Sequence, residues 1–529
     1  MASTSEIKEL LRDRIPIFEK ILEIAKQPGI SIGVLCHGEP VFLHNIGHRN
    51  LEGKKPANED TLYCIGSLTK AFITTSIGQL VADKKFSWNT PVSSIVPGFQ
   101  NKHDVVITTR MTVKDLLSHR SGLTSLDQLI QGLQNQVTVE KSEVVKVINA
   151  LPVKNDFRTA FWYCNILFSL AGHIIERFSG EHTWSAFTRK RIWEPLGMMR
   201  TTASLDVLKK DQNVATPYVT LTDGSMVAVN TPVVSDTHMD GEAGGIRSSV
   251  SDLLKWCKAN LDSLKDKSAN SLKEVGTLTS ATTIMNPENL ADGVYCLGWV
   301  RQSTPAKLGP ISLNRRSRSP LVGASTPSVQ IISHQGDVIG YTGSLYLLPD
   351  TDSAVVTLTN GIGFTDAADW VAQDLIQSIC GLAPSVDFVA EAQAATQGFL
   401  SRFEEEFRKP LEKARKHGTR PGPLKDYVGE YRLDGYDLVL QVQRVPDDAL
   451  KLCMVVNRCP DQVHTLSHFH LDTFCLLPES YDEALTKGYM GTFGHWEEYL
   501  VSFNRLAEGD IGSLTWRFDG VDVSFPRKV

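Results

Sequence analysis

Apolar positions divide the chain into a part that mixes strands with helices and a later part made of strands alone. In the first part, strand-like runs stand at both ends. Residues 29–47 are typical of a hairpin with a polar turn at 37–40, and residues 328–360 of three strands separated by glycine and proline turns. A helical pattern at 366–380 follows. We therefore expect an antiparallel sheet, packed with helices, whose edges come from the two ends of this part.

The pattern changes after Pro384. Residues 388–417 are charged and helical, with Phe399, Phe403 and Phe407 on one stripe, which favours a connecting helix. From residue 421 onward, short alternating strands follow one another as in a small antiparallel β-barrel.

The chain is thus expected to be an α+β protein in three parts. These are a main domain at 1–385, a helical linker at 386–420 and a β-barrel domain at 421–529. A length of 529 residues is too great for one ordinary domain, in agreement with this division.

Composition and charge limit the partners. The chain is 42% hydrophobic and 22% charged, with a net charge of −6, and this mild acidity argues against nucleic acid. The first thirty or so residues predict an amphipathic helix with mixed charges, unlike a secretory signal. No uninterrupted apolar run approaches the roughly twenty residues that span a bilayer. We expect a cytoplasmic protein with no nucleic-acid or membrane partner.

Metal and redox chemistry find little support. The nine cysteines are scattered without a C-x-x-C pair, so most are expected to be reduced and buried. His468 and His470 alternate onto one strand face, but the spacing supplies no third ligand. We predict no metal and no cofactor. The run at Arg315, Arg316 and Arg318 is expected in an exposed loop.

A nucleophile candidate stands at the start of one helical segment. After a turn at Gly66, Ser67 and Lys70 are three apart, so they share a helical face. A lysine among apolar side chains can act as a base, and the helix N-terminus suits an oxyanion. Ser5 and Lys8 have the same spacing without the turn. On spacing alone, a helix-cap serine and a solvated lysine remain the other interpretation.

Two further stretches carry candidate chemistry. Tyr163 and Asn165 lie two apart in a turn, where both can point the same way. An apolar helix follows and is expected to end at Gly180. The alternative is a tyrosine packed in the core with its hydroxyl bonded. His334 and Gly336 lie at the end of a strand that can line a wall beside the Ser67 helix. By itself His334 is more typical of a structural strand end than of a catalytic residue.

Taken together, the S-x-x-K, Y-C-N and H-Q-G motifs resemble those of the serine β-lactamase and penicillin-binding-protein superfamily. The likeness is greatest to the branch of class C β-lactamases, D-aminopeptidases, esterases and transesterases, and the phrases LLSHRSGL, EPLGM, AGGIRSSVSDLLKW, YCLGW and GYTGSLYLLPD agree. It covers about residues 29–380. It implies a β-lactamase/transpeptidase-like sandwich of sheet and helices, followed by a barrel similar to the lipocalin-like domains of some members.

The resemblance also implies a mechanism. Ser67 would attack a carbonyl carbon, and Lys70 and Tyr163 would share the proton transfers. The N–H groups of Ser67 and Asp337 would hold the oxyanion, and Asn165 would position Lys70 and the substrate. The resulting acyl group on Ser67 would pass to water or to another acceptor.

Two positions depart from the usual motifs. Cys164 stands where serine is common, and its side chain is expected to point away from the reacting centre. His334, which with Gly336 belongs to the substrate and oxyanion wall, replaces the lysine of β-lactamases. Histidine is common among esterase-like members and weakens the case for a β-lactam carboxylate. The implied substrate is an intracellular ester, thioester or amide, and carrier-bound thioesters are included. By analogy, the most similar intracellular members are fungal enzymes that act on polyketide or peptide metabolites.

Three functions share these motifs. A serine hydrolase would pass the acyl group to water, an acyltransferase or transesterase to a metabolite hydroxyl or amine, and a binding protein would have lost turnover. The G-x-S-x-G pattern at residues 29–33 lies inside a predicted strand and not at a strand-to-helix turn, so it does not support a Ser-His-Asp hydrolase, and His119 is expected to be structural. We expect the barrel to cover one side of the cleft. Neither the substrate nor the oligomeric state follows from the sequence.

Overall fold

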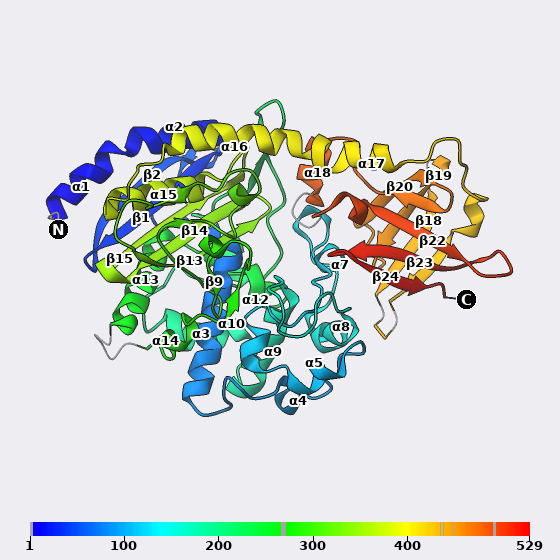
Figure 1. The fold of residues 1–529 in the computed structure, drawn as a ribbon, viewed down its shortest axis with the longest axis horizontal. Coiled ribbons are helices and arrows are strands. Elements are labelled where there is room, and N and C mark those ends of the chain that lie inside the picture. Colours follow the sequence, from blue (N-terminus) through cyan, green and yellow to red (C-terminus); the bar gives the residue numbers. More distant parts are fainter. Residues whose placement is uncertain are drawn as a thin grey trace.

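The computed structural model describes residues 4–265, 271–433, 435–436, 438–446, 448–489 and 494–528. It consists of a large domain built on one antiparallel sheet, a long helical connection and a small barrel (Figure 1). The predicted α+β fold with an antiparallel sheet and a C-terminal barrel is confirmed. Among the described residues, no helix is long and apolar enough to cross a membrane.

The large sheet joins strands from distant parts of the chain. In spatial order its strands are β3 (Lys55–Pro56), β2 (Glu39–Asn50), β1 (Gly29–Cys36), β15 (Ser353–Thr359), β14 (Tyr341–Leu348), β13 (Gln330–Val338), β10 (Val300–Ser303), β9 (Val294–Tyr295) and β8 (Thr283–Ile284). The predicted hairpin of β1 and β2 turns at His37 and Gly38, both with positive φ.

The expectation that the two ends of the domain form the edges of the sheet is wrong. β1 pairs with β15, with Ile30 opposite Thr359, so the ends meet in the middle of the sheet. The physical reason is that every residue of β1 is buried, which suits a strand covered on both faces. The edges are the short strands β3 and β8.

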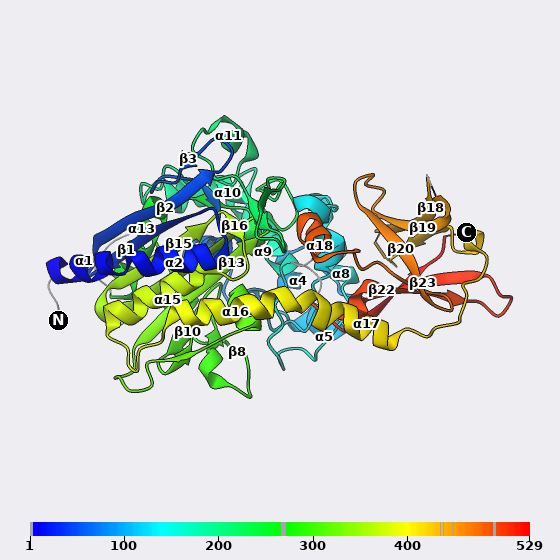
Figure 2. The same cartoon turned by 90° about the horizontal axis from the view of Figure 1, so that it is seen from above.

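Helices cover both faces of this sheet. On one face, α1 (Thr4–Asp13), α2 (Ile15–Ala25) and α15 (Ala367–Cys380) share a core with the strands. On the other face lies α13 (Val250–Leu264), capped by Ser249. Figure 2 shows α2, α15 and α16 running along the molecule beside one another.

A helical region lies beyond that second face. Its centre is α3 (Thr69–Ala82), buried from Thr69 to Leu80, against α9 (Ile166–Ser179), which ends at Gly180 as expected. The helix that follows Thr112 is only one turn long, and the chain takes a positive φ at His119 shortly after it. The shorter helices are α4 (Val92–Ile95), α5 (Val105–Arg110), α6 (Val113–Leu116), α7 (Asp127–Ile130), α8 (Val144–Ala150), α10 (Trp184–Thr188), α11 (Leu205–Lys210), α12 (Gly241–Gly244) and α14 (Val275–Leu278).

Small ladders tie the loops of this domain together. They are β4 (Tyr63–Cys64) with β7 (Arg247–Ser248), β11 (Ala306–Lys307) with β12 (Leu321–Val322), and β16 (Gly361–Ile362) with β5 (Tyr218–Thr220) and β6 (Met226–Ala228).

The connection and the barrel form the rest of the chain. α16 (Phe388–Arg402) packs on α2, and a π-helical stretch (Phe403–Arg408) and α17 (Lys409–Ala414) lead to the barrel, where Phe403 and Phe407 are buried against Tyr481 and Tyr499. The barrel strands are β17 (Gly429–Arg432), β18 (Val439–Val445), β19 (Asp448–Val456), β20 (Val463–His470), β21 (Thr473–Cys475), β22 (Leu500–Arg505), β23 (Ile511–Phe518) and β24 (Val521–Pro526), with α18 (Tyr481–Lys487) between β21 and β22. A bridge between Tyr431 and Arg527 nearly closes the barrel.

Candidate active site

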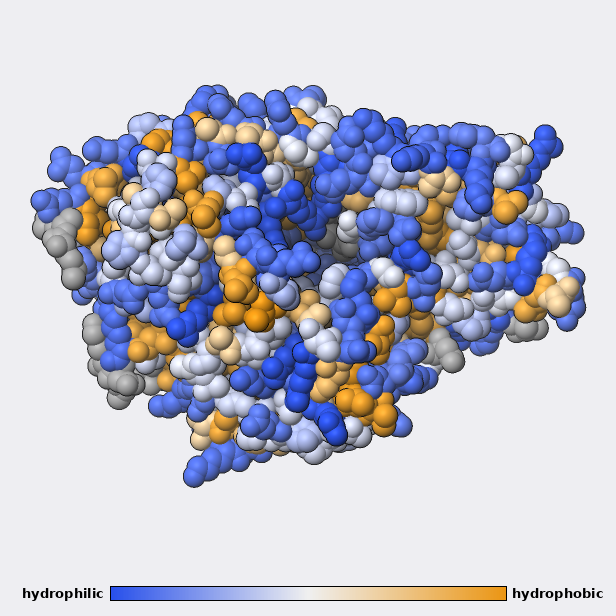
Figure 3. Space-filling model, in the orientation of Figure 1, coloured by the Kyte–Doolittle hydropathy of each residue, from blue (hydrophilic) through white to orange (hydrophobic). Residues whose placement is uncertain are grey.

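Ser67 lines a cavity of about 320 Å³ between the large domain and the barrel. It lies in a 3₁₀ turn (Gly66–Leu68) directly before α3 and is partly exposed. Gly66 is required there: its φ is +51°, and a Cβ at this position would lie 2.7 Å from the carbonyl oxygen of Asp337. The turn is thus pressed against β13. Figure 3 shows the surface hollowed between the two parts of the molecule.

Lys70 lies one turn further along and is fully buried. Its Nζ is 2.9 Å from Ser67 Oγ, 2.8 Å from Asn165 Oδ1 and 3.0 Å from the carbonyl oxygen of Ala243. Burial lowers the pKa of Lys70 from 10.5 to about 7, against the opposing charges of Asp240, Asp127 and Asp337. A large fraction of Lys70 is therefore a neutral amine at neutral pH.

The partners of that amine determine where its lone pair points. The Asn165 and Ala243 oxygens can only accept hydrogen bonds, so both N–H groups of a neutral amine are directed to them. The lone pair is then left for the Ser67 hydroxyl, which becomes the donor. This arrangement is that of a base poised to take the serine proton.

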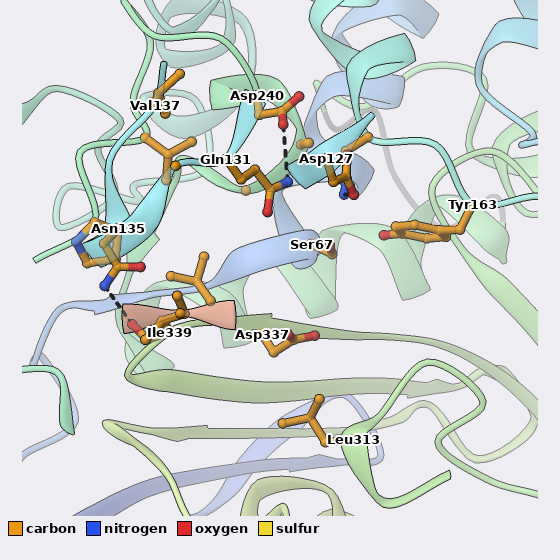
Figure 4. Close-up of a pocket in the computed structure, with 18 of the residues that line it drawn as sticks. Ser67, Asp127, Gln131, Asn135, Val137, Tyr163, Asp240, Leu313, Asp337 and Ile339 are labelled. Carbon is orange, nitrogen blue, oxygen red and sulfur yellow. Dashed lines mark hydrogen bonds between the residues drawn. The ribbon is translucent and has the colours of Figure 1, made fainter. Parts of the chain in front are cut away.

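Tyr163 and Asn165 enter the site from the turn before α9. The Tyr163 hydroxyl is buried and points toward Ser67 (Figure 4). Burial raises the pKa of Tyr163 far above its usual value, while the Ser67 hydroxyl acts in the opposite sense. Tyr163 is therefore a phenol at neutral pH. The side chain of Cys164 is buried, with Sγ 3.4 Å from the Thr124 carbonyl oxygen, and does not line the cavity.

The backbone of Asp337 completes the approach to Ser67. Val338 and Tyr341 flank the two-residue turn between β13 and β14, so they form a hydrogen-bonded pair and Asp337, opposite Thr342, does not. The Asp337 N–H therefore points away from β14, toward the Gly66 turn. The two backbones lie close together there: a Cβ on Gly66 would be 2.8 Å from the Asp337 nitrogen, and a Cβ on Gly336 would be 2.9 Å from the Ser67 nitrogen.

His334 and Gly336 have different places on β13. A Cβ on Gly336 would lie 2.2 Å from the Ile65 carbonyl oxygen, so only glycine allows this close packing. His334 is buried behind the cavity, with Nδ1 2.5 Å from the Gln335 carbonyl oxygen and Nε2 3.4 Å from Tyr295 Oη. Burial, together with the charge of Lys70, lowers the pKa of His334 to about 3, so this histidine is neutral.

Three residues near the site were not expected from the sequence. Asp127 accepts a hydrogen bond from Asn165 Nδ2 at 2.9 Å, and Asp240 accepts one from Gln131 at 3.1 Å (Figure 4). Burial raises the pKa of both carboxyls. His119, expected to be structural, stacks on Tyr163 at 4.2 Å and accepts the N–H of Cys164 at 3.1 Å. No spacing signal in the sequence marks Asp127.

The three arginines at 315–318 lie in two different environments. As expected, Arg315 and Arg318 form surface ion pairs, with Asp292 and Glu391. Arg316 is also accessible, but its accessible surface faces the cavity. Desolvation there lowers the pKa of Arg316 to about 10, so it remains a cation at neutral pH. Among the described residues, no ion pair within 4.0 Å neutralises it.

Metal ligands are not gathered anywhere in the described part of the chain: no group of three His, Cys, Asp or Glu side chains could hold an ion there. His468 donates a hydrogen bond from Nε2 to the Leu471 carbonyl oxygen at 3.0 Å.

The sheet, the buried lysine one turn after a serine, and the tyrosine and asparagine turn define a fold and site of the serine β-lactamase and penicillin-binding-protein type. Residues 16–378 match the Beta-lactamase family, and the chain belongs to that family. Residues 413–527 match a family described as a domain of unknown function (DUF3471).

Individual proteins agree with this assignment. The chain is 27% identical over 473 residues to Unguisins hydrolase ungD of Aspergillus violaceofuscus, covering 81% of this chain and 76% of that protein. It is also 27% identical to Unguisins hydrolase ungD' of Aspergillus campestris, covering 65% of this chain but only 62% of that relative's length. The structure of the octameric penicillin-binding protein homologue from Pyrococcus abyssi shares the fold, with a TM-score of 0.57 at 21% identity over 99% of this chain and 100% of that one.

Proposed function

We propose that the protein is a serine hydrolase that forms an acyl-enzyme on Ser67 and cleaves an ester, thioester or amide of a small molecule. The observation that carries this proposal is the buried amine of Lys70, 2.9 Å from Ser67 Oγ with its other two partners both acceptors. Such an amine is a base for the serine hydroxyl at neutral pH.

In the proposed acylation step, Ser67 Oγ attacks the substrate carbonyl carbon as its proton passes to Lys70 Nζ. The carbonyl oxygen becomes an oxyanion beside the N–H groups of Ser67 and Asp337. When the tetrahedral intermediate collapses, the bond to the leaving group breaks and the leaving group takes a proton. Tyr163 is suited to relay that proton from Lys70, because burial keeps its hydroxyl protonated.

In deacylation, a water molecule attacks the acyl carbon and gives its proton to the same Lys70 and Tyr163 pair. The bond to Ser67 Oγ breaks, Ser67 regains a proton and the carboxylic acid product leaves. The sequence of steps uses only groups of this chain.

The relatives support a hydrolase of small molecules. Two of them carry the name unguisins hydrolase, and the longer match spans 81% of this chain. We extend to this chain the hydrolase class and a secondary-metabolite type of substrate. Arg316 favours substrates that place an anionic or carbonyl-rich group on the β13 side of the cavity.

An acyltransferase is the second candidate, because the cavity that would admit water is also large enough for a small acceptor. It would hand the acyl group from Ser67 to a hydroxyl or amine. Product formation that requires such an acceptor would favour transfer over hydrolysis.

The test is intact-mass analysis after exposure to activated esters, a fluorophosphonate and a β-lactam. Wild type is compared with Ser67→Ala. We expect an adduct that maps to Ser67 and is missing in the variant, followed by slow loss of the ester-derived acyl group. A well-folded wild type that reacts with none of these probes, or that reacts elsewhere, would overturn the proposal.

A further inference from the structure

A segment at residues 125–138 lies between the cavity and the barrel, and we call it the bridging segment. On its inner side, Asp127, Gln131 and Asn135 line the cavity beside Ser67 (Figure 4). Its outer side contacts the barrel. The contacts that hold the bridging segment in place therefore also hold one wall of the candidate active site in place.

The barrel holds the bridging segment at four places along its length. The hydrogen bonds run from Ser125 N–H to Asp519 Oδ2 (2.8 Å), from Gln128 Nε2 to Glu498 Oε2 (3.1 Å), from Leu133 N–H to Gln462 Oε1 (2.6 Å) and from Asn457 Nδ2 to the Thr138 carbonyl oxygen (2.9 Å). On the barrel side, Glu498 and Gln462 are buried, so their bonds are protected from water, whereas Asp519 and Asn457 are partly buried.

The contact between Ser125 and Asp519 is connected to Lys70 by further hydrogen bonds. Asp519 Oδ2 also accepts the Ser125 hydroxyl at 3.1 Å, and Ser125 Oγ accepts the Asp127 N–H at 3.4 Å. Asp127 Oδ2 in turn accepts Asn165 Nδ2 at 2.9 Å, and Asn165 Oδ1 accepts Lys70 Nζ at 2.8 Å. A continuous series of hydrogen bonds thus joins the barrel to Lys70.

Asp127 gives this series a chemical role, because it sets the orientation of the Asn165 amide. A carboxyl oxygen that accepts Asn165 Nδ2 leaves Oδ1 to face Lys70. Without that acceptor, the amide could turn and present its N–H₂ group to Lys70. The lysine N–H would then lose the oxygen that accepts its hydrogen bond. The lone pair of Lys70 would then lose its fixed direction toward Ser67.

The backbone next to Asp127 needs external support. Leu126 has a φ of +51°, in the left-handed region that disfavours a side chain. It is held between the Ser125 contact on one side and the Gln128 contact on the other. Asp519 itself stands in a two-residue turn with Gly520, with φ values of 52° and 81°, which projects it from the hairpin of β23 and β24.

We propose that the C-terminal barrel is a working part of the active site, in which Asp519 is the positioning residue that fixes Asp127 and, through Asp127, the Asn165 amide beside Lys70. This inference rests on the proposed function. It assigns to the domain of unknown function at residues 413–527 a role in holding the active site in place.

The test uses two substitutions of Asp519 that both suit its turn. Asp519→Gly removes the acceptor, whereas Asp519→Asn keeps an acceptor oxygen and the turn propensity. The readout is the rate at which a fluorophosphonate labels Ser67 in the full chain, with thermal unfolding measured in parallel. We expect Asp519→Gly to lower the labelling rate at least tenfold and Asp519→Asn to stay within threefold of wild type. Asp522→Asn, on the same hairpin, is the control and is expected to leave the rate unchanged.

A double-substitution cycle separates positioning from general loosening. If Asp519 acts through Asp127, then Asp519→Gly in an Asp127→Ala background costs less than twofold. If Asp519→Gly does not fold, Ser125→Ala replaces it in the same cycle, with a smaller expected loss of about threefold because the backbone bond to Asp519 remains.

The outcomes are distinct. Full labelling by folded Asp519→Gly, or losses that multiply in the double variant, would overturn the role of the barrel while leaving the proposed function intact. Failure of the wild type to be labelled at Ser67 would overturn the proposed function, and this inference with it.

Discussion

The pH dependence of acylation is the sharpest consequence of the Lys70 environment. With an ordinary pKa of 10.5, only about 0.03% of a lysine is neutral at pH 7. With the pKa lowered to about 7, roughly half of it is neutral, which raises the fraction of active base more than a thousandfold. Because a lowered lysine pKa means that the base is lost as pH falls, the acylation rate should fall about tenfold per pH unit below 6. It should level off above pH 8.

Stopped-flow acylation by an activated ester between pH 5 and 9 measures this profile. Lys70→Arg supplies the matched comparison, because a guanidinium keeps its proton throughout this range. We expect that variant to be slower by at least about a thousandfold at pH 8 and to show no titration near pH 7. A wild-type rate that is flat from pH 5 to 9, or a Lys70→Arg variant that keeps a tenth of the activity, would refute the role of Lys70 as the base.

Three more substitutions follow from the geometry. Tyr163→Phe removes the proton relay but not the base, so we expect acylation to slow by about 10²-fold, with deacylation affected as well, in single-turnover kinetics. Gly66→Ala puts a Cβ 2.7 Å from the Asp337 carbonyl oxygen at a positive φ, and should lower the melting temperature and Ser67 labelling together; unchanged values would contradict the packing described. Arg316→Met should raise KM for anionic esters about tenfold and leave neutral esters within twofold, while Arg315→Met, on the surface, should change neither. Equal effects of the two arginine variants would argue against a role for the cavity-facing one.

Local patterns predicted the elements that carry the site. The hairpin of β1 and β2, the three strands from β13 to β15, and α9 with its Gly180 end appear where alternation, helical spacing and turn residues indicated. These patterns depend on neighbours within a few residues, which the sequence displays directly. The serine and lysine three apart also lie within hydrogen-bonding distance, as their spacing on a helix suggested.

What local patterns could not supply was the pairing of distant segments. The pairing of β1 with β15 in the middle of the sheet depends on tertiary contacts, which the periodicity of apolar residues does not report. Asp127 has no motif, because its place beside Asn165 comes from a tertiary contact between residues 38 apart in the sequence. The direction of Arg316 was missed for a related reason: a charged run indicates exposure, but exposure includes the inside of a cavity.

The pairing of β1 with β15 also has a consequence for how the protein is made. A ribosome releases β1 early, yet the strand that lies beside it in the finished sheet leaves the exit tunnel only after almost the whole large domain has been synthesised. Until then one edge of β1 is unpaired, and its eight residues, all buried in the folded protein, are not yet covered. Such a strand can pair wrongly with another chain. The neighbouring hairpin strand β2 protects only one side. Nascent chains stopped before residue 353 should therefore bind chaperones, and release from them should coincide with the arrival of β15.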